Sequence, residues 1–209
     1  MSDQASVMAE HLPHSEHAPT VDEHFGTASD GKVGMWIFLL TDAMSFSGLL
    51  LGYGILRAGS HDWPDPSDRL GIPSTAIMTF ALICSSVSMV LALEAAKMKD
   101  SKGLQKWLLL TILGGVFFLG GQVREYTNLI REGHVLAQDQ FMSTFYSVTG
   151  FHGMHVFTGV CYLTAIYWQA RKGKYVSGND YNQVEICGLF WHFVDLVWIL
   201  VFTFVYLIK

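Results

Sequence analysis

The sequence predicts an all-α integral membrane protein, a bundle of five transmembrane helices. Hydrophobic residues make up 51% of the chain, and they fill long windows instead of recurring as the stripes of a soluble helix. A helix needs roughly 20 residues to cross about 30 Å of hydrocarbon, and five windows reach that length. These windows are residues 33–57, 72–96, 107–130, 142–168 and 184–208.

The basic residues between these windows predict the orientation of the chain. Two loops carry most of them: Lys97, Lys99, Lys102 and Lys106 in one, and Arg171, Lys172 and Lys174 in the other. The remaining two loops hold only Arg57, Arg69 and Arg131 at their edges. Because cytoplasmic loops carry an excess of Lys and Arg, we expect a cytoplasmic N-terminus and a periplasmic C-terminus.

The N-terminal residues differ in composition from the rest of the chain. The first 30 residues contain six acids, four histidines and neither Lys nor Arg. We expect residues 1–31 to form a disordered cytoplasmic tail rich in His and acid, and residues 32–209 to form the five-helix domain. The tail lacks the basic and apolar regions of a signal peptide, so we expect it to remain on the mature protein.

Charge and cysteine content argue against nucleic-acid binding and against a cysteine-based metal or redox site. The formal net charge is −5, and much of it lies in the tail, so the chain shows no basic footprint for nucleic acid. Cys84, Cys161 and Cys187 fall in different windows without the spacing of a metal or redox motif. They are interpreted as small buried apolar residues.

Several ionisable residues lie inside the apolar windows, where a charge costs roughly 2.5–3.5 kcal/mol and needs a partner, water or a neutral form. Asp42 lies near the middle of the first window, His152 and His155 in the fourth, and His192 and Asp195 in the fifth. Each of the last two pairs is spaced i, i+3 and therefore shares one helical face. The four residues are either a haem or metal site of a stand-alone membrane enzyme or, as we favour, a polar network joining two helices.

Three further polar residues lie nearer the ends of the windows. Arg124 and Glu125 lie near the outer end of the third window, where Arg124 can reach the interface and Glu125 can pair with it or with another helix. Glu185 lies at the inner end of the fifth window, within reach of interfacial water. A proton-coupled carrier using Asp42 and Glu125 is the third hypothesis, but no internal repeat supports it.

Four segments resemble subunit III of the haem-copper terminal oxidases, the cytochrome c oxidase subunit III family. The most specific are TFYSVTGFHGMHVFTG (144–159) and LFWHFVDLVWILVFTFVY (189–206). GVFFLGGQVREY (115–126) is similar to the family helix that carries a glutamine followed by a glutamate, and WIFLLTDAMSF (36–46) to the helix with a membrane-embedded carboxylate. The resemblance covers about residues 32–208, and the chain matches the short, five-helix bacterial form.

The resemblance implies a non-redox subunit of a proton-pumping respiratory oxygen reductase, a translocase of aerobic electron transport. It implies no catalytic residue, metal or haem in this chain, with haem and copper held by partner subunits. His152, His155, His192 and Asp195 would form the interhelical polar network. Asp42 would be the buried acid near subunit I and a cleft that holds structural phospholipid.

The resemblance also implies partners and a location. Subunit I is the main expected contact, followed by subunit II; subunit IV, membrane lipids and a respiratory supercomplex are further candidates. The expected location is the bacterial cytoplasmic (inner) membrane, crossed several times. Cytochrome c is the favoured electron donor of the complex, and a quinol oxidase is the alternative.

Overall fold

The computed structural model describes residues 29–136, 139–175 and 181–208; the expected tail up to residue 28 therefore lies outside the described part. The described residues contain helices and connections and no β-strand. The elements are α1 (Asp30–Gly59), α2 (Pro66–Arg69), α3 (Ile72–Lys97), α4 (Ser101–Arg131), α5 (Gln140–Arg171), α6 (Asn182–Val201) and the π-helical segment η1 (Phe202–Leu207).

Local sequence signals explain several of the helix boundaries. Asp100 caps α4 by accepting hydrogen bonds from the backbone N–H groups of Lys102 and Gly103, at 3.1 and 3.0 Å. Asp139 caps α5 in the same way through the N–H of Met142, at 2.8 Å. Gly133 follows the end of α4 with φ of 86°, a left-handed conformation that glycine adopts without steric cost. These residues therefore account for where α4 and α5 begin and where α4 ends.

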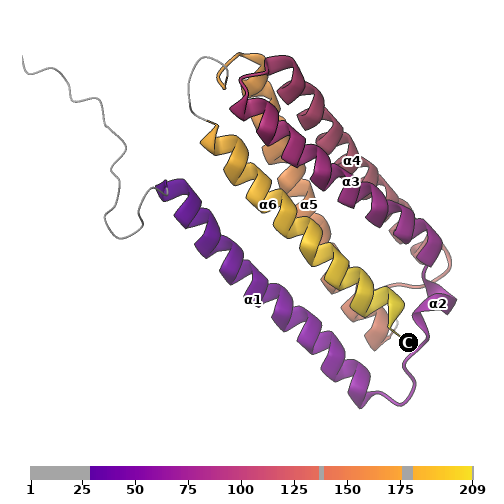
Figure 1. The fold of residues 1–209 in the computed structure, drawn as a ribbon. Helices are drawn as coiled ribbons and strands as arrows, with labels where there is room; N and C mark the ends of the chain where they lie inside the picture. The colour runs from indigo at the N-terminus through magenta and orange to yellow at the C-terminus, as the bar shows by residue number, and fades with distance from the viewer. Residues whose placement is uncertain (1–28, 137–138, 176–180, 209) are drawn as a thin grey trace, which may run out of the picture.

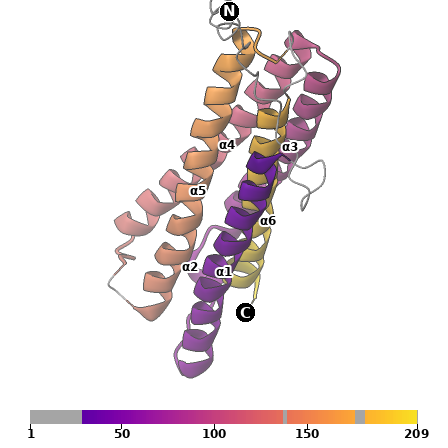
Figure 2. The ribbon, with the colours of Figure 1, turned by 90° about the vertical axis from the view of Figure 1, so that its left-hand side faces the viewer.

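Helix α6 lies at the centre of the bundle, and α1 lies along its edge (Figures 1 and 2). α6 packs against α3, α5 and α1, whereas α1 packs only against α6 and α5 to an appreciable extent. The core around α6 contains the fully buried rings of Trp191, Trp198 and Phe118. Because α1 has few neighbours, most of its apolar surface faces outward, including Leu40 and Met44, which are 67% and 70% exposed.

Helices α3 and α4 have the most extensive contact in the bundle, and glycines of α4 allow it. A Cβ added at Gly114 would lie 2.6 Å from Cβ of Ser85, and one at Gly121 would lie 1.8 Å from Sδ of Met78. Neither distance is physically acceptable, so a side chain at Gly114 would force α3 to move, whereas one at Gly121 would have to displace the flexible Met78 side chain. By contrast, a Cβ at Gly120 would meet nothing within 4 Å.

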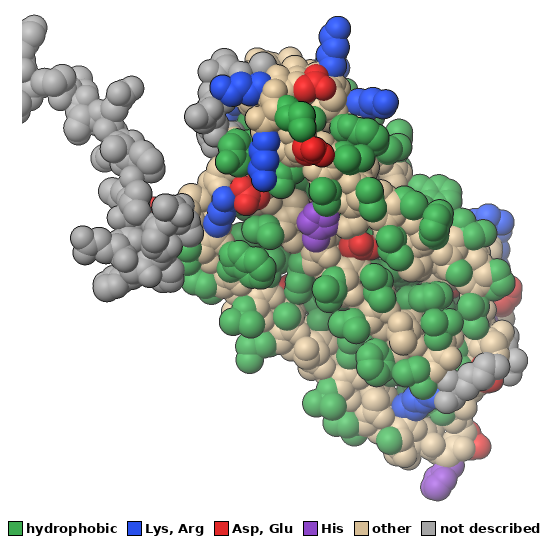
Figure 3. Space-filling view, viewed as in Figure 1, with side chains coloured by type: hydrophobic (Ala, Val, Ile, Leu, Met, Phe, Trp, Pro, Cys, Tyr) green, Lys and Arg blue, Asp and Glu red, His purple; other side chains and the backbone are tan. Residues whose placement is uncertain are grey.

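The outer surface has the character of a membrane protein. Hydrophobic side chains cover the flank in Figure 3, and Lys and Arg gather at the end where α3 ends and α4 begins. By length and composition, four helices of the described chain can cross a membrane: α1, α3, α4 and α6 continued through η1. The prediction of an all-helical membrane protein is therefore confirmed.

Helix α5, expected as a fifth span, is not among those four. Its 32 residues extend about 48 Å at 1.5 Å per residue, which is ample length. The difference from the other four lies in composition, because α5 carries many Ser, Thr, Gly and His residues. Five crossings and the orientation of the termini therefore stay predictions.

Candidate functional site

The buried carboxyl group of Asp42 on α1 contacts His155 on α5. Oδ1 of Asp42 lies 3.2 Å from Nε2 of His155, and the two side chains are 8% and 14% exposed. Nδ1 of His155 lies 2.8 Å from the carbonyl oxygen of Phe151, which can only accept, so Nδ1 carries a proton. A further proton must lie between Nε2 and Oδ1 for these atoms to bond. Whichever of the two atoms carries that proton, the pair is neutral overall.

Glu125 is held between three elements of the bundle. Its Oε1 accepts a hydrogen bond from the hydroxyl of Thr75 on α3, at 3.2 Å, and its Oε2 accepts one from Tyr206 in η1, at 3.1 Å. Glu125 itself is only 9% exposed. The π-helical segment contributes to this contact, since it carries Tyr206 into the interior beside α4. Glu125 therefore pairs with hydroxyls of other helices and not with Arg124.

His192 and Asp195 of α6 meet Ser86 of α3. The Ser86 hydroxyl lies 2.6 Å from Nδ1 of His192. The carboxyl group of Asp195 lies near the same hydroxyl, and its Oδ1 has no hydrogen-bond partner among the described residues. Two further bonds join the same helices: Trp191 Nε1 donates to Ser85 Oγ at 3.1 Å, and Trp198 Nε1 donates to Thr79 Oγ1 at 2.9 Å. These contacts form a polar seam between antiparallel α3 and α6.

His152 is fully buried among aromatic rings. Its ring stacks on Trp198 with a centroid separation of 4.8 Å and meets the edge of Phe118 at 5.7 Å. Neither ring nitrogen has a hydrogen-bond partner among the described residues. His152 thus contacts α6 through packing and not through a polar bond.

The structure therefore divides the four residues that were expected to form one network. His155 contacts Asp42, whereas His192 and Asp195 lie beside Ser86. No hydrogen bond among the described residues joins any two of the four. The i, i+3 spacing identified which residues share a helical face. It could not identify the neighbouring helix, because α6 packs on α3 as well as on α5.

The two remaining predicted residues lie near opposite ends of the bundle. Glu185 in the first turn of α6 forms an ion pair with Lys32 of α1, with Nζ and Oε2 separated by 2.8 Å. Arg124 is exposed on α4 and lines a cavity beside α3. Within the described chain, no group of three or more His, Cys, Asp or Glu side chains is arranged to hold a metal ion.

Sequence reasoning missed a second polar cluster, between α4 and α5. The side-chain amide of Gln122 donates to the carbonyl oxygen of Thr149 at 3.1 Å and to the hydroxyl of Tyr126 at 3.2 Å. The hydroxyls of Tyr126 and Thr149 lie 2.7 Å apart. Gln122 and Tyr126 were visible as part of the family segment, and their i, i+4 spacing was the signal for a shared face.

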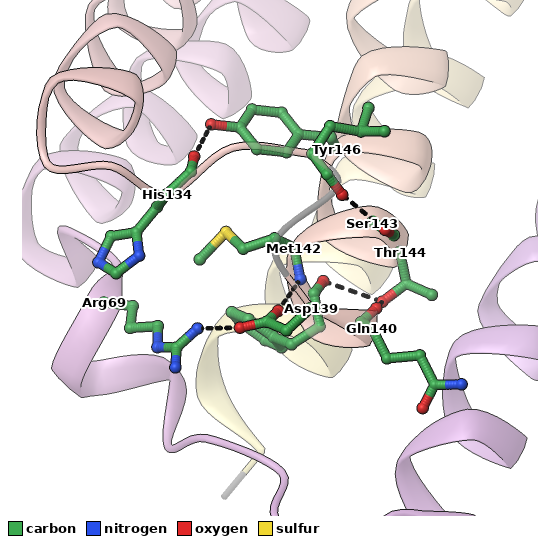
Figure 4. Close-up of polar contacts among 10 residues, drawn as sticks. Arg69, His134, Asp139, Gln140, Met142, Ser143, Thr144 and Tyr146 are labelled. Carbon is green, nitrogen blue, oxygen red and sulfur yellow. Dashed lines mark hydrogen bonds and ion pairs between the residues drawn. The ribbon is translucent and has the colours of Figure 1, made fainter.

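A third contact, outside the apolar windows, joins two connections. Arg69 at the end of α2 pairs with the carboxylate of Asp139, which also caps α5 (Figure 4). Nearby, the Tyr146 hydroxyl donates to the carbonyl oxygen of His134 at 3.0 Å. Partial burial disfavours the charged form of Asp139 and by itself would raise the pKa. The hydrogen bond from the Met142 N–H and the contact with Arg69 favour the charged form more strongly, so the pKa of Asp139 is lowered from 3.8.

The depressed pKa predicts a pH-dependent contribution from Asp139. The folded-state pKa of Asp139 lies below the unfolded value, so its carboxylate stabilises the fold above about pH 4. This stabilisation is lost as the pH falls through the folded-state pKa. Asp139→Asn, which retains a capping group, is expected to cost about 1 kcal/mol or less at pH 7, and Asp139→Ala about 1–2 kcal/mol. Thermal unfolding at pH 7 and pH 3 checks this; a deficit of Asp139→Asn that persists undiminished at pH 3 contradicts it.

These features define a multi-pass membrane protein in which buried polar side chains join helices. The family model "Cytochrome c oxidase subunit III" matches residues 6–209, and the chain belongs to this family. It is 35% identical to cytochrome c oxidase subunit 3 of Thermostichus vulcanus, with 84% of this chain and 86% of that protein covered.

Two other relatives broaden the comparison. Cytochrome c oxidase subunit 3 of Synechocystis is 36% identical over 88% of this chain and 78% of its own length. Quinol oxidase subunit 3 of Bacillus subtilis is 31% identical over 95% of this chain and 97% of its own length. The expected family is therefore confirmed: the chain is a non-catalytic subunit of an oxidase complex that works as an enzyme.

Proposed function

We propose that this chain acts as the subunit III scaffold of a proton-pumping respiratory oxygen reductase, stabilising subunit I and sustaining its proton uptake. The match to the family over residues 6–209 carries this proposal. Haem and copper belong to partner subunits, and this chain contributes helix surfaces and buried acids. Subunit I is the main partner proposed, with subunit II, subunit IV and a respiratory supercomplex as further contacts.

The proposal includes five membrane crossings, with α5 as the fifth. Two features support it: α5 is long enough, and it packs between α4 and α6, both of which can cross a membrane. Five crossings separate the termini, and the lysines near the α3–α4 connection favour a cytoplasmic N-terminus and a periplasmic C-terminus. The bacterial relatives support the cytoplasmic membrane as the location.

Within this function, Asp42 and His155 are proposed to serve the interface with subunit I and a lipid cleft. The support is geometric. The pair lies between α1 and α5, and α1 has an apolar face that the rest of the described chain leaves exposed. Because the pair is neutral overall, it can lie within hydrocarbon without placing a net charge there. His192, Asp195 and Ser86 are proposed to hold α6 against α3 as a positioning seam.

Removal of this chain from the oxidase is the direct test. We expect the depleted complex to begin at the normal rate of oxygen reduction and then to lose turnover and proton uptake over successive cycles. Asp42→Asn in the intact complex is expected to reproduce part of that loss while leaving assembly unchanged. A Soret band from the isolated chain, or a depleted complex with undiminished sustained turnover, contradicts the proposal.

A quinol oxidase is the second candidate, favoured by the nearly complete coverage of the Bacillus subtilis relative. The two candidates differ in the donor to the complex and not in the role of this chain. Cytochrome c is proposed as the donor, in line with the names of the Thermostichus and Synechocystis proteins. Subunit II from the purified complex decides between them, since a Cys and His copper site indicates cytochrome c and its absence indicates quinol.

A further inference from the structure

A groove runs along α3 and α4 on the side of the bundle away from α1. Its volume is about 570 Å³, and α3, α4 and the residues just before α3 line it. α3 and α4 are the most extensively paired helices, with α2 near the start of α3 (Figure 1). α1 packs on α5 and α6, so this groove is separate from the Asp42 region.

The lining of the groove is amphipathic along its length. Phe117, Gly120 and Gly121 line it near the middle of α4, where Ile77 and Met78 of α3 lie opposite. Polar side chains line its other part, toward the end of α4: Arg69, Ser74, Arg124, Asn128 and Glu132. Apolar lining at mid-membrane depth and polar lining near the helix ends match a molecule with a hydrocarbon chain and a polar head.

The length of the groove fits one leaflet of a bilayer. Phe117 and Glu132 are 15 positions apart, which is about 22 Å along a helix. Half of a 30 Å hydrocarbon core plus one headgroup layer measures roughly 20–22 Å. With α4 centred in the bilayer, Phe117 lies near the midplane and Arg124 about 3 Å below the hydrocarbon surface, within snorkelling distance of the headgroups.

The charges of the groove favour a zwitterionic headgroup. Arg124, Asn128 and Glu132 are spaced four residues apart and share one face of α4. Arg69 is paired with Asp139, and both oxygens of Glu125 accept hydroxyl groups, so these two charges already have partners. Arg124 and Glu132 remain as one cation and one anion at headgroup depth, which suit a phosphate and an ammonium group respectively.

We propose that this groove binds one zwitterionic phospholipid, with its phosphate at Arg124 and Asn128, its amine at Glu132 and an acyl chain along Gly120 and Phe117. The proposal requires only that α3 and α4 cross the membrane, and it does not depend on the role proposed for Asp42. Gly120 has no neighbour within 4 Å and leaves room where a side chain would otherwise fill the groove.

Two variants of the chain in its intact complex test the site. Gly120→Leu places a side chain in the groove and is expected to remove one tightly held phospholipid per complex, counted by native mass spectrometry in mild detergent. Gly34→Leu is the control, because Gly34 also has no neighbour within 4 Å but lies near the start of α1. Arg124→Gln is expected to weaken retention about tenfold, whereas Arg131→Gln on the same helix outside the groove leaves it unchanged.

The headgroup is tested by relipidation of the delipidated complex. We expect phosphatidylethanolamine to be retained in preference to phosphatidylglycerol, and inorganic phosphate not to compete. Equal retention of both lipids, competition by phosphate, or an unchanged lipid count in Gly120→Leu overturns the proposal. Loss of a partner subunit from the Gly120→Leu complex without loss of lipid also overturns it, because the groove would then hold a protein helix.

Discussion

Gly114→Ala is expected to lower the free energy of unfolding by about 1–3 kcal/mol, whereas Gly120→Ala leaves it unchanged or raises it by up to about 1 kcal/mol. The two glycines lie on the same helix, but their surroundings differ. The added methyl at Gly114 would lie 2.6 Å from Cβ of Ser85, which cannot move without α3. At Gly120 it meets nothing, and alanine is the better helix former.

Denaturation of the two variants in detergent, with assembly into the oxidase as a second readout, measures this difference. The sign of the change in the free energy of unfolding at Gly114 is the decisive result, because helix propensity alone predicts that both substitutions stabilise the protein. If Gly114→Ala were as stable as Gly120→Ala, the close approach of α3 and α4 would be contradicted.

The second large effect is expected from the Asp42–His155 pair. Asp42→Leu leaves Nε2 of His155 without its buried partner, and His155→Phe leaves the carboxyl group alone; each is expected to cost about 2–5 kcal/mol. The double variant Asp42→Leu/His155→Phe removes both polar groups together. It should cost less than the sum of the single variants by about 1–3 kcal/mol.

Asp42→Asn is the matched control for this cycle. Because Nδ1 of His155 faces a carbonyl oxygen, Nε2 can accept a hydrogen bond from the asparagine amide, so the cost should be about 1 kcal/mol or less. Strictly additive single and double variants, measured by the same denaturation, would mean that the two residues act independently. The comparison also separates stability from proton transfer, since Asn retains the contact but carries no ionisable proton.

Much of the fold could be predicted because it depends on local and one-dimensional properties. Each expected window lies within one long helix, with the last window continuing through η1, because apolar length is read directly from sequence. The helix starts at Ser101 and Gln140 follow from the capping residues before them. The π-helical turn that carries Tyr206 inward was not predictable, since no residue type in FTFVYL specifies it.

The candidate site was predictable in composition but not in pairing. Asp42, His155, His192 and Asp195 were identified because ionisable groups within apolar windows are costly and need partners. Their partners depend on how the helices are arranged around α6. Nothing in the sequence around Ser86 identifies it as a partner of His192, and only the position of α3 beside α6 shows that the two side chains bond.

The sequence by itself determined the helical membrane class, the family and the identity of the buried polar residues, because hydropathy, charge and motif are properties of residues in order. Only the tertiary structure decided that His155 meets Asp42, that α6 is bonded to α3, and that a groove with Arg124 opens beside Gly120. The physical reason is that a helix presents several faces to several neighbours. Which neighbour each face meets is set by close packing, such as that at Gly114, and not by the spacing of residues along one helix.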